Sequence, residues 1–385
     1  MRGVAIIGVG STPFGKIEGQ GIVDLAVAAC REALAEARIP REKIQALYLG
    51  NFVGERLANQ GSLAALLAGR LGLTGIPATK VEGACASGGI AFRHGVLTIA
   101  LGLYDFVLVA GTEKMTASPT PEVTAALATA GDEALEMRAG LTFPGAFGII
   151  MREHMARHGT TREQIGLVSV KNHGFGAQNP KAQFRKPVTL EEVLNSRLVA
   201  DPIRLFDCPP ISDGAAAALL CPAEWARDFH GKPMRVLGTG HATGPATLWE
   251  MDDITSFPAT VRAAREAFAS ARIAPGDVQV AEVHDCFTMA EIVATEDLGF
   301  FPKGKGGPAV EDGQTGLDGK VAVNPSGGLI AKGHPVGATG CAQIYELVKQ
   351  LRGEAANQVR NAEIGLAHNL GGTGVVSTVT ILRRM

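Results

Sequence analysis

A repeated segment constrains this chain more than any other feature of its sequence. Residues 31–39 read Arg-Glu-Ala-Leu-Ala-Glu-Ala-Arg-Ile and residues 265–273 read Arg-Glu-Ala-Phe-Ala-Ser-Ala-Arg-Ile, so seven of nine positions are identical. Each copy leads through a short turn into an expected strand, at residues 44–49 and 278–283, and a Ser-Gly-Gly sequence follows each strand. Alanine-rich helices can resemble one another by chance, but the shared order of the landmarks favours two similar halves of one fold.

The pattern of hydrophobic residues predicts strands and helices that alternate along the chain, which is typical of an α/β architecture. The expected strands are residues 4–9, 46–49, 106–110, 215–220, 280–283, 364–367 and 375–382. The expected helices are residues 22–37, 61–71, 86–101, 257–271 and 338–351. A chain of 385 residues is too long for one small core, so we expect more than one structural unit.

A long segment interrupts the first of the two expected halves. It includes a polar stretch at residues 171–187 that we expect to be irregular. Long insertions in compact domains are commonly lids or binding regions, so this one is a candidate cover for a large substrate. The expected units are a first half at 1–115 and 196–233, an inserted loop domain at 116–195, and a second half at 234–385.

Composition excludes several classes of function. Lys and Arg number 36 against 38 for Asp and Glu, a formal net charge of −2, which indicates neither a nucleic-acid nor an anionic-membrane partner. No apolar run reaches the roughly 18 residues of a membrane span. The first residues enter an expected strand directly, so we expect no targeting peptide and a cytoplasmic location. None of the six cysteines forms a Cys-x-x-Cys pair, so we expect reduced thiols and no bound metal.

The segment Val81-Glu-Gly-Ala-Cys85-Ala-Ser-Gly-Gly-Ile90 places a cysteine where an expected strand gives way to a helix. Unpaired backbone N–H groups and the positive end of the helix dipole would stabilise a thiolate there and lower the pKa of Cys85. A thiol with a lowered pKa is a candidate nucleophile. The alternative is a small cysteine buried in the core.

Two histidine segments lie in the expected second half. Ala281-Glu-Val-His-Asp-Cys-Phe287 follows a strand, at the end where α/β proteins place their chemistry, and His284 and Cys286 would share a face in an extended conformation. His334 stands alone in a loop rich in glycine and proline, residues 324–340, where it can act as a base near neutral pH. The alternatives are a hydrogen-bonded core histidine for His284 and an ordinary surface turn for His334.

A glycine-rich turn between two expected strands, Ala367-His-Asn-Leu-Gly-Gly-Thr-Gly374, completes the candidate segments. Gly371 and Gly372 allow a backbone N–H to approach a reacting carbonyl, as an oxyanion hole requires. The alternative is a plain hairpin turn.

Together these four segments resemble the thiolase superfamily, most closely its sterol-carrier-protein type with archaeal and bacterial relatives. The resemblance spans essentially the whole chain and includes Asp207-Cys-Pro-Pro-Ile-Ser-Asp-Gly-Ala-Ala-Ala217. It implies a five-layered αβαβα fold of two similar halves, with a loop domain inserted in the first. It also implies an acyltransferase that forms acetoacetyl-CoA from acetyl-CoA, or cleaves a 3-ketoacyl-CoA, with coenzyme A as substrate or product and no cofactor.

The resemblance assigns a role to each matching side chain. Cys85 matches the acyl-accepting nucleophile, and His334, in Gly-His-Pro, matches the base that activates it. His284 stands where conventional thiolases have an asparagine, and with His334 it would bind the thioester oxygen of the second substrate.

The oxyanion hole and the second acid or base are also implied by the resemblance. The backbone N–H groups of Cys85 and Gly371 would hold the oxygen of the acyl group, and Asn369 is a further candidate for this hole. Conventional thiolases have a second catalytic cysteine at the position of Asn369. In this chain Cys286 is therefore the candidate for the second acid or base.

The resemblance implies partners and leaves two alternatives. The implied partners are a second or further copies of the chain in a homodimer or homotetramer, hydroxymethylglutaryl-CoA synthase and a small zinc-ribbon/OB-fold protein, acting in the mevalonate pathway. One alternative is a thiolase-like retro-aldolase acting on a β-hydroxyacyl-CoA, although such relatives tend to lose the nucleophile that Cys85 provides here. The other is a non-catalytic CoA-binding subunit of a complex.

Overall fold

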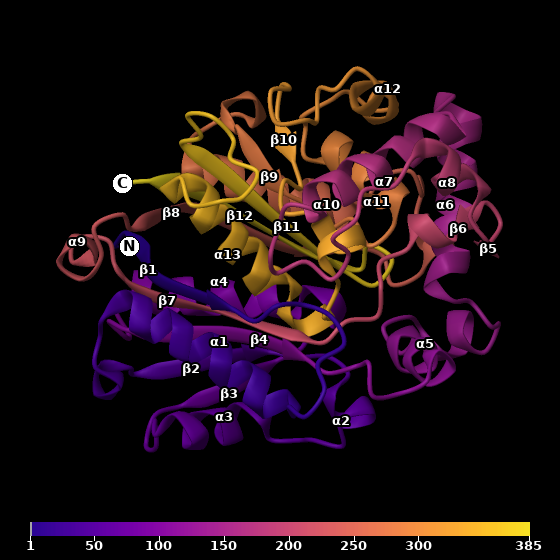
Figure 1. The fold of residues 1–385 in the computed structure, drawn as a ribbon. Helices are drawn as coiled ribbons and strands as arrows, with labels where there is room; N and C mark the ends of the chain where they lie inside the picture. Colours follow the sequence, from indigo (N-terminus) through magenta and orange to yellow (C-terminus); the bar gives the residue numbers. More distant parts are fainter. Residues whose placement is uncertain (1) are drawn as a thin grey trace.

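The computed structural model describes residues 2–385, in which one large mixed sheet is covered by helices (Figure 1). The sheet has ten strands in the order β10-β9-β11-β12-β8-β1-β7-β4-β2-β3. Its first half contains β1 (Val4–Ser11), β2 (Ala46–Gly50), β3 (Ala78–Val81), β4 (Val107–Glu113) and β7 (Gly214–Pro222). Its second half contains β8 (Met234–Thr243), β9 (Val280–Glu282), β10 (Ala322–Val323), β11 (Ile364–Gly371) and β12 (Val376–Arg384).

The two halves of the sheet have the same topology. Read outward from the middle, the order is β1-β7-β4-β2-β3 on one side and β8-β12-β11-β9-β10 on the other. In each half the first two neighbouring pairs are antiparallel and the next two are parallel. A short antiparallel pairing of β1 with β8, centred on Ala5 and Arg235, joins the halves. The two similar halves predicted from the repeat are confirmed by this arrangement.

Helices form three layers around the two half-sheets. The outer helices of the first half are α1 (Ile22–Ala37), α2 (Gly54–Leu57) and α3 (Leu63–Leu71), and those of the second are α10 (Pro258–Ala271), α11 (Thr288–Asp297) and α12 (Gly306–Glu311). Helices α4 (Ser87–Ala100) and α13 (Thr339–Arg352) lie between the half-sheets, in a core to which both contribute side chains. Separate apolar clusters join α1 and α3 to the first half and α10 to the second. This stacking is the predicted five-layered αβαβα fold.

The repeat is explained by close packing of a helix on a glycine-containing strand. In β1, a side chain on Gly8 or Gly10 would meet the carbonyl oxygens of Ala33 and Ala29 in α1. The same relation recurs in the second half, where Gly238 and Gly240 of β8 lie under α10. The Gly-x-Gly near the N-terminus is therefore a packing site for a helix, and the alanines of the repeat are the residues that make the approach possible.

The second Ser-Gly-Gly does not begin a helix equivalent to α4, so this part of the prediction is wrong. The helix that corresponds to α4, which begins at Ser87, is α13, which begins at Thr339. The second Ser-Gly-Gly, residues 326–328, instead precedes a π-helical turn, Gly328–Lys332, that has no counterpart before α4. The equivalent turns are Ala84–Ala86 and Val336–Ala338, one directly before each central helix.

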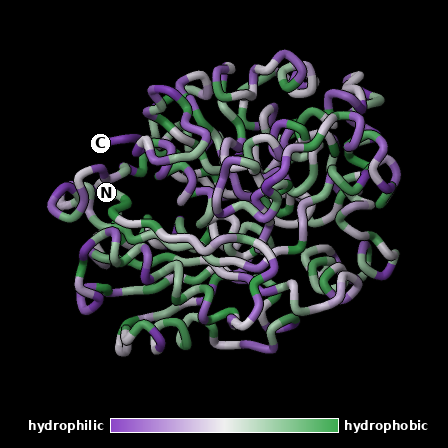
Figure 2. Tube along the Cα trace, in the orientation of Figure 1, coloured by the Kyte–Doolittle hydropathy of each residue, from purple (hydrophilic) through white to green (hydrophobic). Residues whose placement is uncertain are grey.

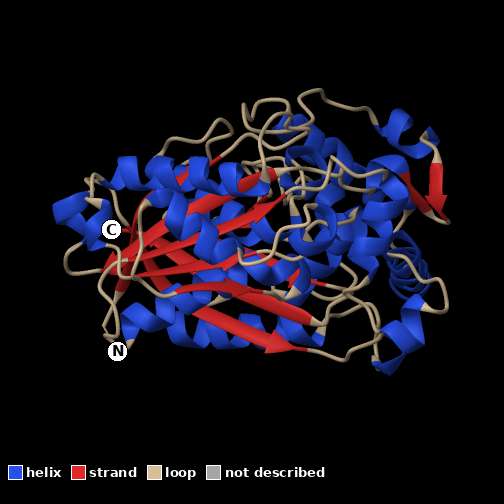
Figure 3. Cartoon of the chain, turned by 90° about the horizontal axis from the view of Figure 1, so that it is seen from below, coloured by secondary structure: helices blue, strands red, loops and turns tan. Residues whose placement is uncertain are grey.

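The first half contains a long excursion between β4 and β7. It holds α5 (Thr120–Ala128), α6 (Phe143–His158), α7 (Arg162–Gly176), α8 (Leu190–Asn195) and the ribbon of β5 (Leu198–Ala200) with β6 (Ile203–Arg204), gathered at one end of the molecule (Figure 3). The equivalent strands β11 and β12 are joined by residues 372–375 alone. The domain division at 116–195 remains a prediction. The irregular stretch expected at 171–187 is wrong over residues 171–176, which belong to α7, and is confirmed over 177–187, which contain no helix or strand.

Hydrophobic residues follow the strands and central helices, and hydrophilic residues concentrate in the outer loops (Figure 2). A short helix, α9 (Ala226–Phe229), closes the first half before β8 begins. Across residues 2–385, every helix is too short or too polar to cross a membrane.

The two central helices meet at glycines. A Cβ on Gly88 of α4 would lie 2.9 Å from the carbonyl oxygen of Gly337 and 3.0 Å from the backbone nitrogen of Cys341. A Cβ on Gly340 of α13 would collide with the backbone of Gly89. Bare backbone at these positions therefore lets the start of one helix touch the start of the other.

Replacing Gly340 by Ala should destabilise the fold, because the added methyl group has no room between the two helix starts. Overpacking of this kind costs about 1–3 kcal/mol in the free energy of unfolding, measurable by chemical denaturation. Gly69→Ala in α3 is the matched control, since a Cβ there meets nothing within 4 Å. That control should gain at most about 1 kcal/mol from its better helix propensity. Equal stability of Gly340→Ala and the wild type would contradict the close approach.

Candidate active site

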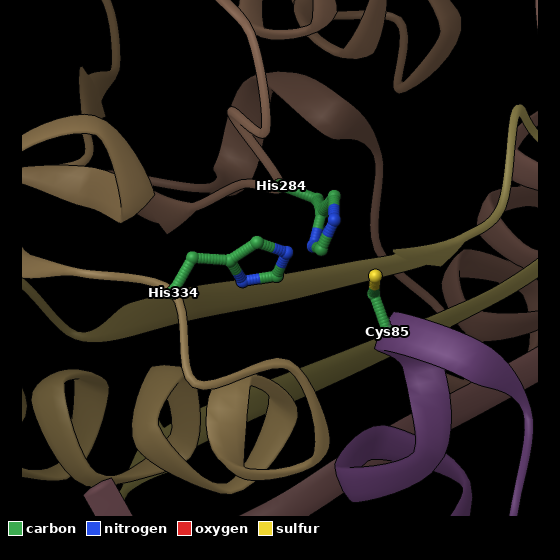
Figure 4. Close-up of side chains that lie close together, drawn as sticks. All are labelled: Cys85, His284 and His334. Carbon is green, nitrogen blue, oxygen red and sulfur yellow. The ribbon is translucent and has the colours of Figure 1, made fainter. Parts of the chain in front are cut away.

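Three side chains from distant parts of the sequence converge where the two halves meet. The sulfur of Cys85 and one ring nitrogen from each of His284 and His334 all lie within 4.8 Å of one another. The imidazole rings are nearly perpendicular, with centroids 5.0 Å apart, and both face the sulfur (Figure 4). Cys85 comes from the turn before α4, His284 follows β9, and His334 lies between the π-helical turn and α13. The structure thus brings together three of the side chains that the sequence singled out.

The turn that presents Cys85 is tight and internally bonded. Ala84 has a φ of 50°, a left-handed conformation that is uncommon for residues other than glycine. The Ser87 hydroxyl donates to the Ala84 carbonyl at 2.6 Å and accepts from the Gly83 N–H at 3.0 Å. Ser87 therefore fixes the turn from inside. Cys85 as a residue is partly exposed at the tip of the turn, but its sulfur is buried against the two histidines.

The pKa of Cys85 is raised, not lowered. Burial, followed by the charge of Glu113, raises the pKa of this thiol to about 12, although the backbone N–H groups of Gly372 and of Cys85 itself act in the opposite direction. Glu113 is fully buried, and burial raises its own pKa to about 7. The lowered pKa expected from the helix start is therefore wrong, because loss of water outweighs the local dipoles. Cys85 rests as a thiol and needs a base.

His334 is placed to be that base. Its backbone N–H donates to the Ser212 hydroxyl at 3.0 Å, and its Nδ1 lies 2.8 Å from the Thr339 hydroxyl oxygen. That hydroxyl donates to the carbonyl of Pro335 at 3.1 Å, so it accepts the Nδ1 proton of His334. Nε2 is left with a lone pair, and Figure 4 shows this edge of the ring turned toward the other two side chains. Burial lowers the pKa of His334 to about 3, which keeps the ring neutral.

His284 is also a neutral imidazole. Burial, then the neighbouring rings of His334 and His368, lowers its pKa well below the usual value. Its Nδ1 lies 3.2 Å from the Asn369 side-chain nitrogen, which also donates to the Cys85 carbonyl at 2.9 Å. Both amide hydrogens of Asn369 are therefore engaged, and its side chain has no donor left for a substrate oxygen. This is not the arrangement expected of Asn369 as a member of an oxyanion hole.

Cys286 lies beside the three-residue cluster but outside it. Its side chain is 8% exposed and packs in an apolar group with Phe287, Leu329 and Leu370. Burial, followed by the charges of Cys85 and Asp285, raises its pKa well above the usual value for a thiol. Cys286 therefore rests as a neutral thiol that is close enough to Cys85 to interact with it electrostatically.

The glycine turn after β11 lies against Cys85. The backbone N–H of Gly372 acts to lower the pKa of the Cys85 thiol, which places this turn next to the sulfur. Gly371 as the backbone donor of an oxyanion hole stays a prediction. Gly372 has a φ of 62°, a conformation that favours glycine. Gly371 packs on the carbonyl of Gly83 at the base of the cysteine turn.

A carboxylate that the sequence did not single out ties the two histidine loops together. Asp285 accepts hydrogen bonds from the backbone N–H of Leu329 at 2.7 Å and from the Asn172 side chain at 2.8 Å. Burial, followed by repulsion from Glu291, raises the pKa of Asp285 to about 7. Asp285 thus joins the loop of His284, the turn before His334 and a helix of the insertion. Its place in the sequence between His284 and Cys286 was the one feature that could have identified Asp285 as part of the site.

The insertion supplies apolar walls next to Cys85. Val123 and Ala126 of α5 and Met115 form a cluster with Val53 and Val336, and the Cys85 side chain packs against it. An apolar surround strengthens every electrostatic interaction at the sulfur. The cysteine and two histidines are also potential ligands of a soft metal ion such as zinc.

Known proteins resemble this chain over its full length. The family model described as the thiolase N-terminal domain matches residues 4–224, and the one described as thiolase C-terminal domain-like matches residues 240–384. An acetyl-CoA acetyltransferase of Methanothermobacter thermautotrophicus is 50% identical to this chain, and the alignment covers 100% of both proteins.

More distant similarities extend to an animal protein and a solved structure. Bovine sterol carrier protein 2 is 38% identical over 97% of this chain and 71% of its own length. A solved structure described as the Ltp2-ChsH2(DUF35) aldolase superposes with a TM-score of 0.87 at 26% identity, covering 99% of this chain and 97% of that one.

Alkylation of Cys85 by iodoacetamide in the ligand-free protein should be slow at neutral pH. Below the pKa of a thiol, the thiolate fraction grows about tenfold per pH unit, so the rate should rise steeply between about pH 7 and 9. Peptide mapping by mass spectrometry assigns the modified residue, and Cys85→Ser provides the blank. A rate that is already level at neutral pH would indicate a lowered pKa and contradict the dominance of burial.

Proposed function

Because this chain belongs to the thiolase family, we propose that it catalyses the reversible Claisen condensation of two acetyl-CoA molecules to acetoacetyl-CoA and coenzyme A. The observation that carries this proposal is the convergence of the Cys85 sulfur with nitrogens of His284 and His334 within 4.8 Å. Support also comes from the acetyl-CoA acetyltransferase that is 50% identical over the full chain. The reverse reaction is thiolysis of a 3-ketoacyl-CoA.

The first half-reaction forms the acyl-enzyme. The Cys85 proton passes to the lone pair on Nε2 of His334 as the sulfur attacks the carbonyl carbon of acetyl-CoA. The backbone N–H groups of Cys85 and of Gly371 or Gly372 hold the oxygen while its charge develops. The bond from carbon to the CoA sulfur then breaks, and the leaving thiolate takes the proton of Cys286.

The second half-reaction forms the carbon–carbon bond. The Cys286 thiolate left by the first step removes a proton from the α-carbon of a second acetyl-CoA. Nε2–H groups of His284 and of protonated His334 hold the enolate oxygen, and the carbanion attacks the Cys85 thioester. The Cys85 sulfur leaves and recovers its proton from His334. Each proton is thereby returned, and two acetyl-CoA give one acetoacetyl-CoA and one CoA.

The raised pKa of Cys286 is consistent with this order of events. A thiol with a raised pKa begins as a proton donor, which is what the departing CoA thiolate requires. In thiolysis the same thiol protonates the departing acetyl-CoA enolate. The two directions therefore use Cys286 in the same resting state.

We further propose that the insertion and the two halves have different roles. The insertion, predicted at 116–195, covers the acyl-CoA substrate, while the halves at 1–115 with 196–233 and at 234–385 supply the reacting side chains. Strand β3 is the edge of the sheet and only partly buried, which supports pairing with another copy in a homodimer or homotetramer. The two-component name of the solved aldolase supports a protein partner. That this partner is a small zinc-ribbon/OB-fold protein remains a proposal. Association with hydroxymethylglutaryl-CoA synthase, a place in the mevalonate pathway and a cytoplasmic location remain proposals.

A second candidate function is retro-aldol cleavage of a β-hydroxyacyl-CoA. It is favoured by one observation, the TM-score of 0.87 to the solved aldolase. That reaction needs no acyl group on Cys85, so Cys85→Ala would leave it intact. Loss of all CoA-ester cleavage in this variant excludes retro-aldol chemistry as the main activity.

Cys85→Ala should abolish acyl transfer while leaving the fold intact. Incubation of the wild type with acetyl-CoA should add one acetyl group to Cys85, detected by intact-protein mass spectrometry and peptide mapping, because the sulfur is the acyl acceptor. Cys30→Ala is the control, since Cys30 is a fully buried thiol in the outer helix α1. Thiolysis retained by Cys85→Ala would remove the mechanism.

Cys286→Ala should separate the two half-reactions. Loss of a general acid or base typically costs about 10²–10⁴-fold in rate, and we expect that loss in condensation. Acetylation of Cys85 should persist, because the CoA thiolate can leave without being protonated by the protein. Quenched-flow mass spectrometry measures the acyl-enzyme, and acetoacetyl-CoA formation measures condensation. Equal rates of condensation in variant and wild type would show that another group moves the α-proton.

A further inference from the structure

The side chain of Asn369 is fixed by three hydrogen bonds at the centre of the cluster. Its Oδ1 accepts from the backbone N–H of Gly89 at 3.1 Å. Its Nδ2 donates to the Cys85 carbonyl at 2.9 Å and lies 3.2 Å from Nδ1 of His284. The residue is 2% exposed, so the side chain is shielded from bulk solvent.

The backbone determines which way this amide points. The Gly89 N–H can only donate, so the oxygen of Asn369 must face it, and the Cys85 carbonyl can only accept, so the nitrogen must face that side. An inverted amide would place two donors together at Gly89 and two acceptors together at Cys85. The atom next to Nδ1 of His284 is therefore an N–H donor, and no choice of amide orientation removes it.

We propose that Asn369 is a positioning residue that holds His284 in the tautomer with its proton on Nε2. A donor facing Nδ1 requires a lone pair there, and the proton of the neutral ring must then be on the other nitrogen. Thr339 imposes the opposite tautomer on His334, with its proton on Nδ1. The cluster thus contains one imidazole that donates and one that accepts, both through Nε2.

The two opposite tautomers fit the proposed reaction, and this part of the argument rests on the proposed function. His334 must accept the Cys85 proton, and His284 must donate to the enolate oxygen. A His284 with its proton on Nδ1 would present a lone pair to a negatively charged oxygen. Asn369 prevents that arrangement without touching the substrate.

The same tautomer works against capture of a soft metal ion. Zinc would bind the Cys85 thiolate and the lone pairs of both rings, since the three ligand atoms lie within 4.8 Å of one another. Metal-bound histidines usually donate their other N–H to an acceptor, and Asn369 offers a donor instead. Asn369 therefore disfavours zinc binding by Cys85, His284 and His334. This consequence does not depend on the proposed function.

The test uses Asn369→Asp, because a carboxylate of nearly the same shape can only accept. At mildly alkaline pH, the introduced carboxylate should draw the His284 proton to Nδ1 and leave a lone pair on Nε2. In full-length protein labelled with ¹⁵N-histidine, the Nε2 resonance of His284 should move from the range of a protonated ring nitrogen to that of an unprotonated one. His284→Asn identifies the signal, and the His334 resonances are the internal control because Thr339 is unchanged.

Two further measurements complete the experiment. Zinc affinity, titrated with ZnCl₂ and a competing chelator, should rise by about 10- to 100-fold in Asn369→Asp, as for a supporting ligand partner. Condensation should fall by about 10²–10³-fold, as for a lost oxyanion donor, while the acetyl group still forms on Cys85. Asn369→Ala, which has neither donor nor acceptor, should lose condensation and should gain less zinc affinity than Asn369→Asp, because it removes the opposing donor without supplying an acceptor.

Different results overturn different claims. A wild-type His284 with its proton on Nδ1 would overturn the assignment directly. Unchanged tautomer and zinc affinity in Asn369→Asp, with only a lower melting temperature and lower activity, would show that Asn369 is merely structural. Absence of acetyl-Cys85 in the wild type would overturn the proposed function and leave the tautomer and zinc results to stand alone.

Discussion

The contact between the starts of α4 and α13 is the constraint on which the rest of the structure depends. Each of these helices begins on a turn, and the two turns belong to equivalent positions in two similar halves. Gly88 and Gly340 allow backbone to touch backbone where the helices meet. Cys85 on the first turn and His334 just before the second are therefore held close together by the central layer of the fold.

Burial at this meeting point sets the chemistry of the cluster. It raises the pKa of Cys85 to about 12 and lowers that of His334 to about 3, so the resting pair is a thiol beside a neutral imidazole. Such a pair exchanges a proton only when a substrate stabilises the charge that results. The neutral state also means that hydrogen-bond partners, not net charge, decide what each ring presents. Thr339 and Asn369 therefore determine the character of the site as much as the histidines do.

The sequence predicted those parts of the fold that depend on local pattern. The helix expected at 22–37 is α1 itself, and the helix expected at 257–271 differs from α10 by one residue, because both carry the repeat. It missed β8, whose glycines are explained only by the helix lying on them. It also reversed the direction of the Cys85 pKa shift, because burial, followed by the charge of Glu113 from another strand, depends on tertiary packing. It named Asn369 but not its action, because the partners of that amide lie more than 80 positions away.

The two halves share a topology, yet the nucleophile lies in only one of them, and packing explains why. If the turns before α4 and α13 are aligned on Ser87 and Thr339, the residue equivalent to Cys85 is Gly337. A Cβ on Gly337 would lie 2.7 Å from the Cα of Asn51 and 2.8 Å from a carboxylate oxygen of Glu113. The first half thus occupies the space that a second side chain would need. The second turn therefore needs bare backbone at the position where the first turn carries Cys85, and only the first turn can supply a sulfur.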